Sequence, residues 1–210
     1  MLVAILTVLA FFSALLTILA AYQKRQLTHY LFKPLTMVFI ISIALLSKNP
    51  VSPFYRWAII IGLIFSLAGD IFLMLPEDRF IPGLLSFLCA HIFYMVAFTR
   101  ESGHALSLWT LIPFLIYGGL MLRLLSAHLG KIRLAVLIYM LVILSMGWTA
   151  AGRRLLTEQE GSLPAFLGAI LFIASDSLLA VDKFKGRFRS AQLLILTTYF
   201  TAQWLIALST

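Results

Sequence analysis

Two aspartates, Asp70 and Asp176, lie deep inside long apolar segments of the chain. A carboxylate in hydrocarbon costs at least ~2.5–3.5 kcal/mol, so both side chains are expected to face a polar cavity. Two carboxyls in one low-dielectric cleft can divide the roles of acid and base, because each disfavours ionisation of the other. That arrangement suits hydrolysis through an oxocarbenium-like species, as in glycosidases. The alternatives are a structural pair bonded to neighbouring helices and an ion pathway.

The other acidic residues need no such cavity. They fall in predicted loops or at a predicted helix end, at Glu77, Asp78, Glu101, Glu158, Glu160 and Asp182. Asp70 and Asp176 are therefore the acidic residues that indicate a working site.

His91 and Tyr94 are three residues apart, which places them on one face of a helix. His91 can orient an aspartate, carry a proton, form a metal site with the aspartates, or simply be a hydrogen-bonded core residue. No second histidine or glutamate stands at ligand spacing from it, so we expect no metal and no cofactor.

Cations flank the same region of the predicted bundle. Lys33 and Pro34 are placed in the first turn of a helix, where the lysine either reaches the interface or meets an anionic headgroup. Residues 183–189 alternate cations with aromatics, from Lys183 onward. This segment either holds its loop in the cytoplasm against anionic lipid or grips a substrate phosphate. Three further side chains complete the candidate polar cavity: Ser175, Tyr199 and Gln203.

Membrane-spanning helices must position all of these residues. The chain is 62% hydrophobic and 11% charged, which lies outside the range of soluble globular proteins. Its formal charge is +8, but the Lys and Arg residues fall almost entirely between apolar runs. We therefore interpret them as topology determinants and lipid contacts; neither nucleic acid nor a protein partner is implied. A single cysteine, Cys89, excludes an intramolecular disulfide.

Apolar runs of about the ~20 residues needed to cross a bilayer recur along the chain. They predict a single all-α membrane domain over residues 1–210, with eight helices at 1–22, 31–47, 55–75, 80–99, 105–124, 131–151, 162–181 and 190–208. The first run lacks a basic n-region, so we expect a mature helix rather than a signal peptide.

The distribution of cations predicts the orientation. The connections after the first, third, fifth and seventh helices carry eleven Lys and Arg residues, counting Lys33 and Arg123, whereas the others carry five. Because cytoplasmic loops are enriched in these residues, both termini are expected to face away from the cytoplasm. Asp70 and Asp176 then lie roughly 8 Å inside the cytoplasmic ends of their helices, at ~1.5 Å per residue.

The two halves of the chain also resemble each other faintly. Asp70 is followed by Phe87, Ala90 and His91, and Asp176 is followed by Tyr199, Ala202 and Gln203. A parallel repeat of four helices plus four would place both aspartates at matching depth. Chance similarity among apolar segments is the alternative.

Together these residues make the sequence resemble the YhhN family, the lysoplasmalogenases of bacterial and animal membranes. The resemblance extends over the second to eighth predicted helices. Its matching elements are Lys33-Pro34, Gly69-Asp70 with Leu73, Gly83 through Phe87 to Ala90-His91 and Tyr94, Gly168 through Phe172 to Ser175-Asp176 with Leu179 and Lys183, and Tyr199-Phe200 with Ala202-Gln203.

The resemblance implies an activity as well as an eight-helix architecture. Characterised members hydrolyse the vinyl ether bond of lysoplasmenylethanolamine or lysoplasmenylcholine, giving a fatty aldehyde and glycerophosphoethanolamine or glycerophosphocholine. It further implies that Asp70 and Asp176 are the catalytic pair and that the substrate is a lysophospholipid among membrane lipids. We expect the protein to lie in the bacterial inner membrane.

Two other classes of function remain open at this point. A small proton-coupled membrane transporter also needs intramembrane carboxylates, but its site usually lies near the bilayer midplane between broken helices. The predicted position of both aspartates toward one leaflet favours an enzyme. A non-catalytic scaffold or lipid sensor is the third class, and it would tolerate loss of both carboxylates.

Overall fold

The computed structural model describes the chain except residues 48–49, 78, 102–106 and 157–158. Over the described residues, eight helices are long and apolar enough to cross a membrane. They are α1 (Leu2–Tyr22), α2 (Gln26–Leu45), α3 (Pro53–Met74), α4 (Phe80–Glu101), α5 (Leu108–Leu125), α6 (Arg133–Leu156), α7 (Ser162–Ala180) and α8 (Ala191–Leu208). A single π-helical turn, Val181–Lys185, continues from α7.

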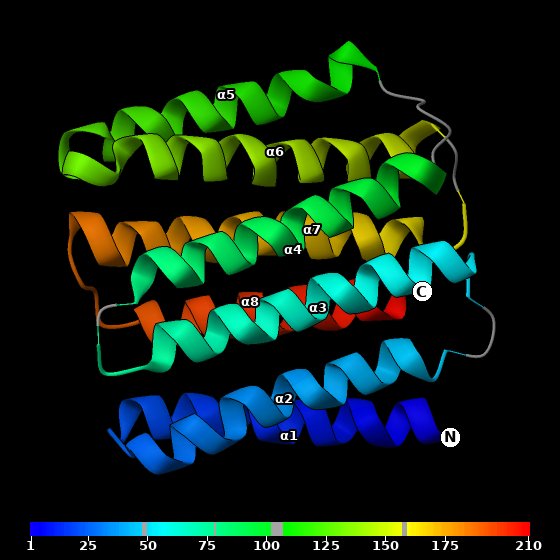
Figure 1. Cartoon of the computed structure of the whole chain (residues 1–210), viewed down its shortest axis with the longest axis horizontal. Helices are drawn as coiled ribbons and strands as arrows, with labels where there is room; N and C mark the ends of the chain where they lie inside the picture. Colours follow the sequence, from blue (N-terminus) through cyan, green and yellow to red (C-terminus); the bar gives the residue numbers. More distant parts are fainter. Residues whose placement is uncertain (48–49, 78, 102–106, 157–158) are drawn as a thin grey trace.

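The helices run side by side in alternating directions, and both chain termini lie at the same end of the bundle (Figure 1). We call the opposite end the basic end, because the α1–α2, α5–α6 and α7–α8 connections there carry Lys24, Arg25, Lys131 and the cations of residues 183–189. Asp70 and Asp176 each lie four residues before the end of their helix, on the side of the basic end. The predicted matching depth of the two aspartates is therefore confirmed.

The predicted helices are confirmed, and two boundaries differ by about a turn. α2 begins at Gln26 rather than at residue 31, so Pro34 lies inside the helix and not in its first turn. The sequence QLTHY is polar enough to escape an apolar-run search, yet it continues the helix into the interface. Proline removes one helical N–H, and membrane helices tolerate this where neighbouring groups satisfy the backbone. The carbonyl that loses its helical donor is that of Tyr30; two residues further on, the Ser13 and Thr36 hydroxyls both hydrogen-bond the Phe32 carbonyl.

α6 continues to Leu156 rather than ending at residue 151, which moves Arg153 from a predicted loop into the helix. The Arg153 side chain is fully buried at the end of the bundle opposite the basic end. Its Nη1 donates to the Tyr55 hydroxyl at 2.7 Å, and its Nη2 donates to the Glu160 carbonyl at 2.8 Å. These bonds replace water around the guanidinium, which is why a charge that looked like a loop residue is held inside.

Glycines on α3 let α4 approach closely and so fix the helix that carries Asp70 against the helix that carries His91. A Cβ on Gly69 would lie 2.7 Å from the Phe87 ring, and a Cβ on Gly62 would overlap the Tyr94 ring. Phe87 and Tyr94 are both buried, so neither ring can move outward easily. The register of α3 on α4 is therefore set by glycine on one helix and aromatic rings on the other.

Replacing Gly62 by alanine should lower the free energy of unfolding by about 1–3 kcal/mol, the usual cost of overpacking a core. Gly119→Ala is the matched control, because Gly119 is exposed and its Cβ would meet no atom within 4 Å. That variant should gain up to about 1 kcal/mol from helix propensity. Thermal unfolding in detergent measures both, and equal shifts would show that the Gly62–Tyr94 contact does not limit packing.

Candidate active site

Asp70 is sealed inside the bundle with two partners. Lys33 Nζ of α2 lies 3.0 Å from Asp70 Oδ1, and the Tyr199 hydroxyl of α8 donates to Asp70 Oδ2 at 2.7 Å. Asp70 is 2% exposed and Lys33 is 8% exposed. The expectation that Lys33 reaches the interface or a headgroup is therefore wrong. A buried lysine beside a buried carboxylate forms an ion pair, since each would otherwise be an uncompensated charge.

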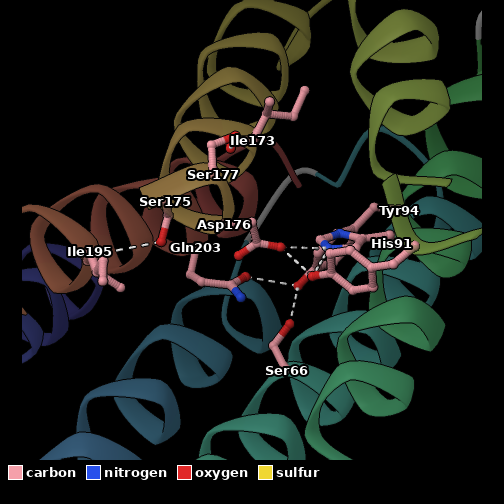
Figure 2. Close-up of polar contacts among 10 residues, drawn as sticks. Ser66, His91, Tyr94, Ile173, Ser175, Asp176, Ser177, Ile195 and Gln203 are labelled. Carbon is pink, nitrogen blue, oxygen red and sulfur yellow. Dashed lines mark hydrogen bonds and ion pairs between the residues drawn. The ribbon is translucent and has the colours of Figure 1, made fainter. Parts of the chain in front are cut away.

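Asp176 has a different set of partners. The Tyr139 hydroxyl of α6 donates to Asp176 Oδ2, and the same hydroxyl lies 2.9 Å from His91 Nε2. His91 Nε2 is also 3.5 Å from Asp176 Oδ2 (Figure 2). No Lys or Arg pairs with Asp176 in the part of the chain that the structure describes. Its polar partners are a tyrosine hydroxyl and a histidine ring, whereas Asp70 is paired with a lysine.

The hydrogen bonds also fix a direction for protons. Because the Tyr139 hydroxyl donates to Asp176, it can accept from the Nε2–H of His91. This assigns a proton to Nε2. His91 Nδ1 is a buried atom with no hydrogen-bond partner among the described residues. The chain of donors therefore runs from His91 through Tyr139 to Asp176.

A pocket of about 70 Å³ opens beside Asp176. Most of its lining is apolar and comes from α3 to α7, and its polar groups are Asp176, Tyr139, Tyr117 and Ser177. The Asp176 side chain is 15% exposed, whereas Asp70 does not contribute to the lining. The expectation that both carboxylates face each other across one cavity is therefore not met, because only Asp176 reaches it.

Aromatic rings stand between the two carboxylate clusters. The Phe172 ring packs against His91 with centroids 4.6 Å apart and against Tyr199 with centroids 5.5 Å apart. Phe87 packs edge-on against both Phe172 and Tyr199, and it also lines the pocket. The ring of Tyr199, held by Asp70, is thus part of the packing that supports the pocket wall.

The remaining predicted site residues divide into three groups. The Tyr94 hydroxyl donates to Gln203 Oε1 at 2.9 Å and lies 3.4 Å from the Ser66 hydroxyl, in a buried cluster that does not line the pocket (Figure 2). Ser175 points away from Asp176 and donates to the Ile195 carbonyl at 3.2 Å (Figure 2). Lys183 lies 5.1 Å above the ring of Phe80, which lines the pocket.

Sequence reasoning missed Tyr139, the residue in closest contact with Asp176. It was one tyrosine in an apolar run. A usable signal did exist in its spacing, because Tyr139 precedes Asp176 by 37 residues and Lys33 precedes Asp70 by the same number. In the part of the chain that the structure describes, no three His, Cys, Asp or Glu side chains come together as metal ligands.

The partners of the two aspartates support the predicted repeat. Each aspartate contacts a residue of the preceding helix in its own half, Lys33 for Asp70 and Tyr139 for Asp176. Each also contacts the fourth helix of the other half, through Tyr199 and His91 respectively. The helices around the two aspartates are thus arranged alike, but Asp70 is closed off from the pocket and Asp176 lines it.

The fold and this site define an integral multi-pass membrane protein that carries one buried and one partly exposed carboxyl group near one end of a helical bundle. The chain belongs to the YhhN family, whose model matches residues 28–210. No solved structure matches it.

Named relatives cover most of the chain. Lysoplasmalogenase TMEM86A of Bos taurus is 38% identical over 156 residues, which are 72% of this chain and 64% of that protein. Human lysoplasmalogenase TMEM86B is 36% identical over 70% of this chain and 61% of that protein. The membrane protein YhhN of Escherichia coli O157:H7, described as uncharacterized, is 27% identical over 94% of each chain. The chain thus spans less than two thirds of the length of these two mammalian relatives.

Proposed function

We propose that this protein is a lysoplasmalogenase-type hydrolase of the bacterial inner membrane. It cleaves the vinyl ether bond of lysoplasmenylethanolamine or lysoplasmenylcholine. The observation that carries the proposal is the position of Asp176. Its carboxyl lines a largely apolar pocket, accepts a hydrogen bond from the Tyr139 hydroxyl and lies close to His91 Nε2. The names of the mammalian relatives supply the substrate class.

The depth of Asp176 suits this substrate. Four residues separate it from the end of α7, which is roughly 6 Å at ~1.5 Å per residue. The vinyl ether of a lysolipid lies just below its headgroup, so the bond and the carboxyl occupy the same layer. Lys183 above the Phe80 ring then lies at the rim, on the side where the phosphate of the substrate would be.

Vinyl ether hydrolysis begins with a slow proton transfer to carbon. The Asp176 carboxyl delivers its proton to the β-carbon, the π electrons form the new C–H bond, and an oxocarbenium ion remains at the α-carbon. The carboxylate left on Asp176 stabilises this cation in an apolar pocket, where water screens it little.

The same carboxylate completes the reaction. Water adds to the α-carbon and gives a proton back to Asp176, which restores the acid and forms a hemiacetal. The hemiacetal then breaks its C–O bond to glycerol as its hydroxyl proton passes to the departing oxygen. The products are the fatty aldehyde and the glycerophospho compound, and Asp176 has acted first as acid and then as base.

Asp70 contributes through position. Its charge is balanced by Lys33, and it is closed off from the pocket. By holding the Tyr199 hydroxyl it fixes a ring that packs on Phe87 and Phe172, and Phe87 is part of the pocket wall. In this proposal Asp176 is the reacting carboxyl and Asp70 is a positioning carboxylate, in place of the two reacting carboxyls expected from the sequence.

Tyr139→Phe should lower kcat by about 10- to 100-fold with little change in KM, because it removes the donor that orients Asp176 and breaks the chain to His91. Tyr55→Phe is the matched control, since it removes a buried tyrosine hydroxyl that contacts Ser209 and Arg153 at the other end of the bundle. Steady-state aldehyde release measures both. Equal losses of kcat would mean that the Tyr139 hydroxyl matters only for folding.

Purified protein tests the function directly when it is given three lysolipids that differ only at the first glycerol carbon. The vinyl ether should release fatty aldehyde, whereas the saturated 1-alkyl ether and the 1-acyl ester should release none. Absence of aldehyde from the vinyl ether would remove the proposal. Proton movement in proteoliposomes without any hydrolysis would instead favour the transporter.

A further inference from the structure

A second pocket, of about 380 Å³, lies at the basic end and has no residue in common with the pocket at Asp176. Its walls come from the last turn of α1, the start of α2, the α7–α8 connection and the start of α8. We call it the α1–α2 pocket. It does not contain Asp70, Asp176, Tyr139 or His91, so nothing proposed for it rests on the hydrolase function.

Positive charge dominates the α1–α2 pocket. Lys24, Arg25 and Arg187 line it, against a single carboxylate, Asp182. Asp182 Oδ1 already accepts the backbone N–H of Phe188 at 3.2 Å. In the part of the chain that the structure describes, no carboxylate forms an ion pair with Lys24, Arg25 or Arg187. Three cations thus outnumber the one carboxylate in the lining of this pocket.

The turn that presents two of these cations keeps a lysine at an unfavourable position. Lys24 has φ 55, in the left-handed region where glycine is the usual residue after a helix. The backbone N–H of Gln23 and that of Arg25 bond the last carbonyls of α1, at Leu19 and Ala20, so the turn is a closed helix end. A lysine there adds charge to the pocket at a conformational cost that glycine would avoid.

The location of the pocket favours a lipid. α1 and α2 form one edge of the bundle (Figure 1), so a pocket at their connection lies at the periphery, where lipid surrounds a membrane protein. Tyr30 lines it and is 38% exposed, and Tyr22 beside it is 47% exposed. Tyrosine is enriched at the level of lipid headgroups. His29 adds a half-buried ring whose Nδ1 lies 3.4 Å from the Thr17 carbonyl.

We propose that the α1–α2 pocket binds the phosphate group of an anionic membrane phospholipid, at a site separate from the pocket at Asp176. Arg25 and Arg187 provide guanidinium forks suited to phosphate oxygens, and Lys24 adds a third positive charge. A lipid bound there would contact the α7–α8 connection. This connection supplies Asp182 and Arg187 to the α1–α2 pocket and Phe184 to the pocket at Asp176.

The test measures phosphatidylglycerol bound to the full chain in phosphatidylcholine nanodiscs, by native mass spectrometry over a series of lipid ratios. The pocket variant is Lys24→Gly with Arg25→Gln and Arg187→Gln, whose glycine suits the turn. The control is Arg123→Gln with Lys131→Gln and Arg133→Gln, which removes three exposed cations from the same end of the bundle.

The pocket variant should bind phosphatidylglycerol more than about tenfold more weakly than wild type, because it removes three cations that would contact the same phosphate group; loss of one charge-assisted hydrogen bond, about 1.5 kcal/mol, already corresponds to roughly tenfold. The control should stay within about threefold. Equal weakening of both variants, or none, would overturn the proposal, because the attraction would then belong to the whole basic surface.

Glycerol 3-phosphate separates the two sources of phosphate. If it stays unbound at millimolar concentration while phosphatidylglycerol binds, the occupant is a membrane lipid. If wild type binds both equally and the pocket variant loses both, the pocket takes a phosphate ester from the aqueous phase.

Discussion

Aldehyde release should fall by at least about 10³-fold when Asp176 is replaced by asparagine, because the amide can neither deliver the proton to carbon nor balance the cation that follows. The variant keeps a polar side chain of nearly the same shape, so the Tyr139 hydroxyl retains an acceptor. The loss should appear in kcat, with KM nearly unchanged, and single-turnover kinetics with excess protein measures it.

Glu77→Gln is the control for this change, since it removes a carboxylate that is 72% exposed and pairs with Arg79 outside the helices. Its activity should match wild type. Activity of Asp176→Asn within tenfold of wild type, in folded protein, would contradict the role given to Asp176.

The second large effect concerns stability. Lys33→Met leaves Asp70 as a buried charge without its partner, and it should lower the free energy of unfolding by about 3–5 kcal/mol. Adding Asp70→Asn to the same protein removes the stranded charge and should recover most of that loss. Denaturation in detergent micelles, followed by tryptophan fluorescence, measures the single and double variants side by side.

The folded double variant also separates position from chemistry at Asp70. A single Asp70→Asn change strands Lys33, so its lost activity would say little about the reaction. Lys33→Met with Asp70→Asn should keep activity within about tenfold, because the amide oxygen still accepts from Tyr199. Complete loss in the stable double variant would instead restore the original hypothesis of two reacting carboxyls.

The helices could be predicted because a bilayer demands about 20 apolar residues per crossing, and this chain meets that demand without long loops. The ends of α2 and α6 could not, since the polar stretch at residues 26–30 and the buried Arg153 depend on neighbouring helices. A prediction from hydropathy puts a charged residue such as Arg153 in a loop, because it takes no account of the hydrogen-bond partners that allow the residue to be buried.

The sequence predicted which residues belong to the site better than it predicted which of their side chains contact each other. Asp70 and Asp176 stood out by their cost in hydrocarbon, but nothing local states that Lys33 turns inward or that Tyr199 reaches across from the other half. Tyr139 is the instructive omission. A tyrosine in an apolar helix is unremarkable until its spacing from Asp176 is compared with the spacing of Lys33 from Asp70.

The central claim is that Asp176 transfers a proton to the β-carbon of a vinyl ether, and hydrolysis of lysoplasmenylethanolamine in deuterium oxide tests it most directly. The aldehyde is reduced as it forms, and a parallel incubation of unlabelled aldehyde corrects for exchange. Wild-type protein should yield product with one deuterium on the carbon next to the former carbonyl, formed far more slowly by Asp176→Asn. Product without deuterium at that carbon would contradict the account.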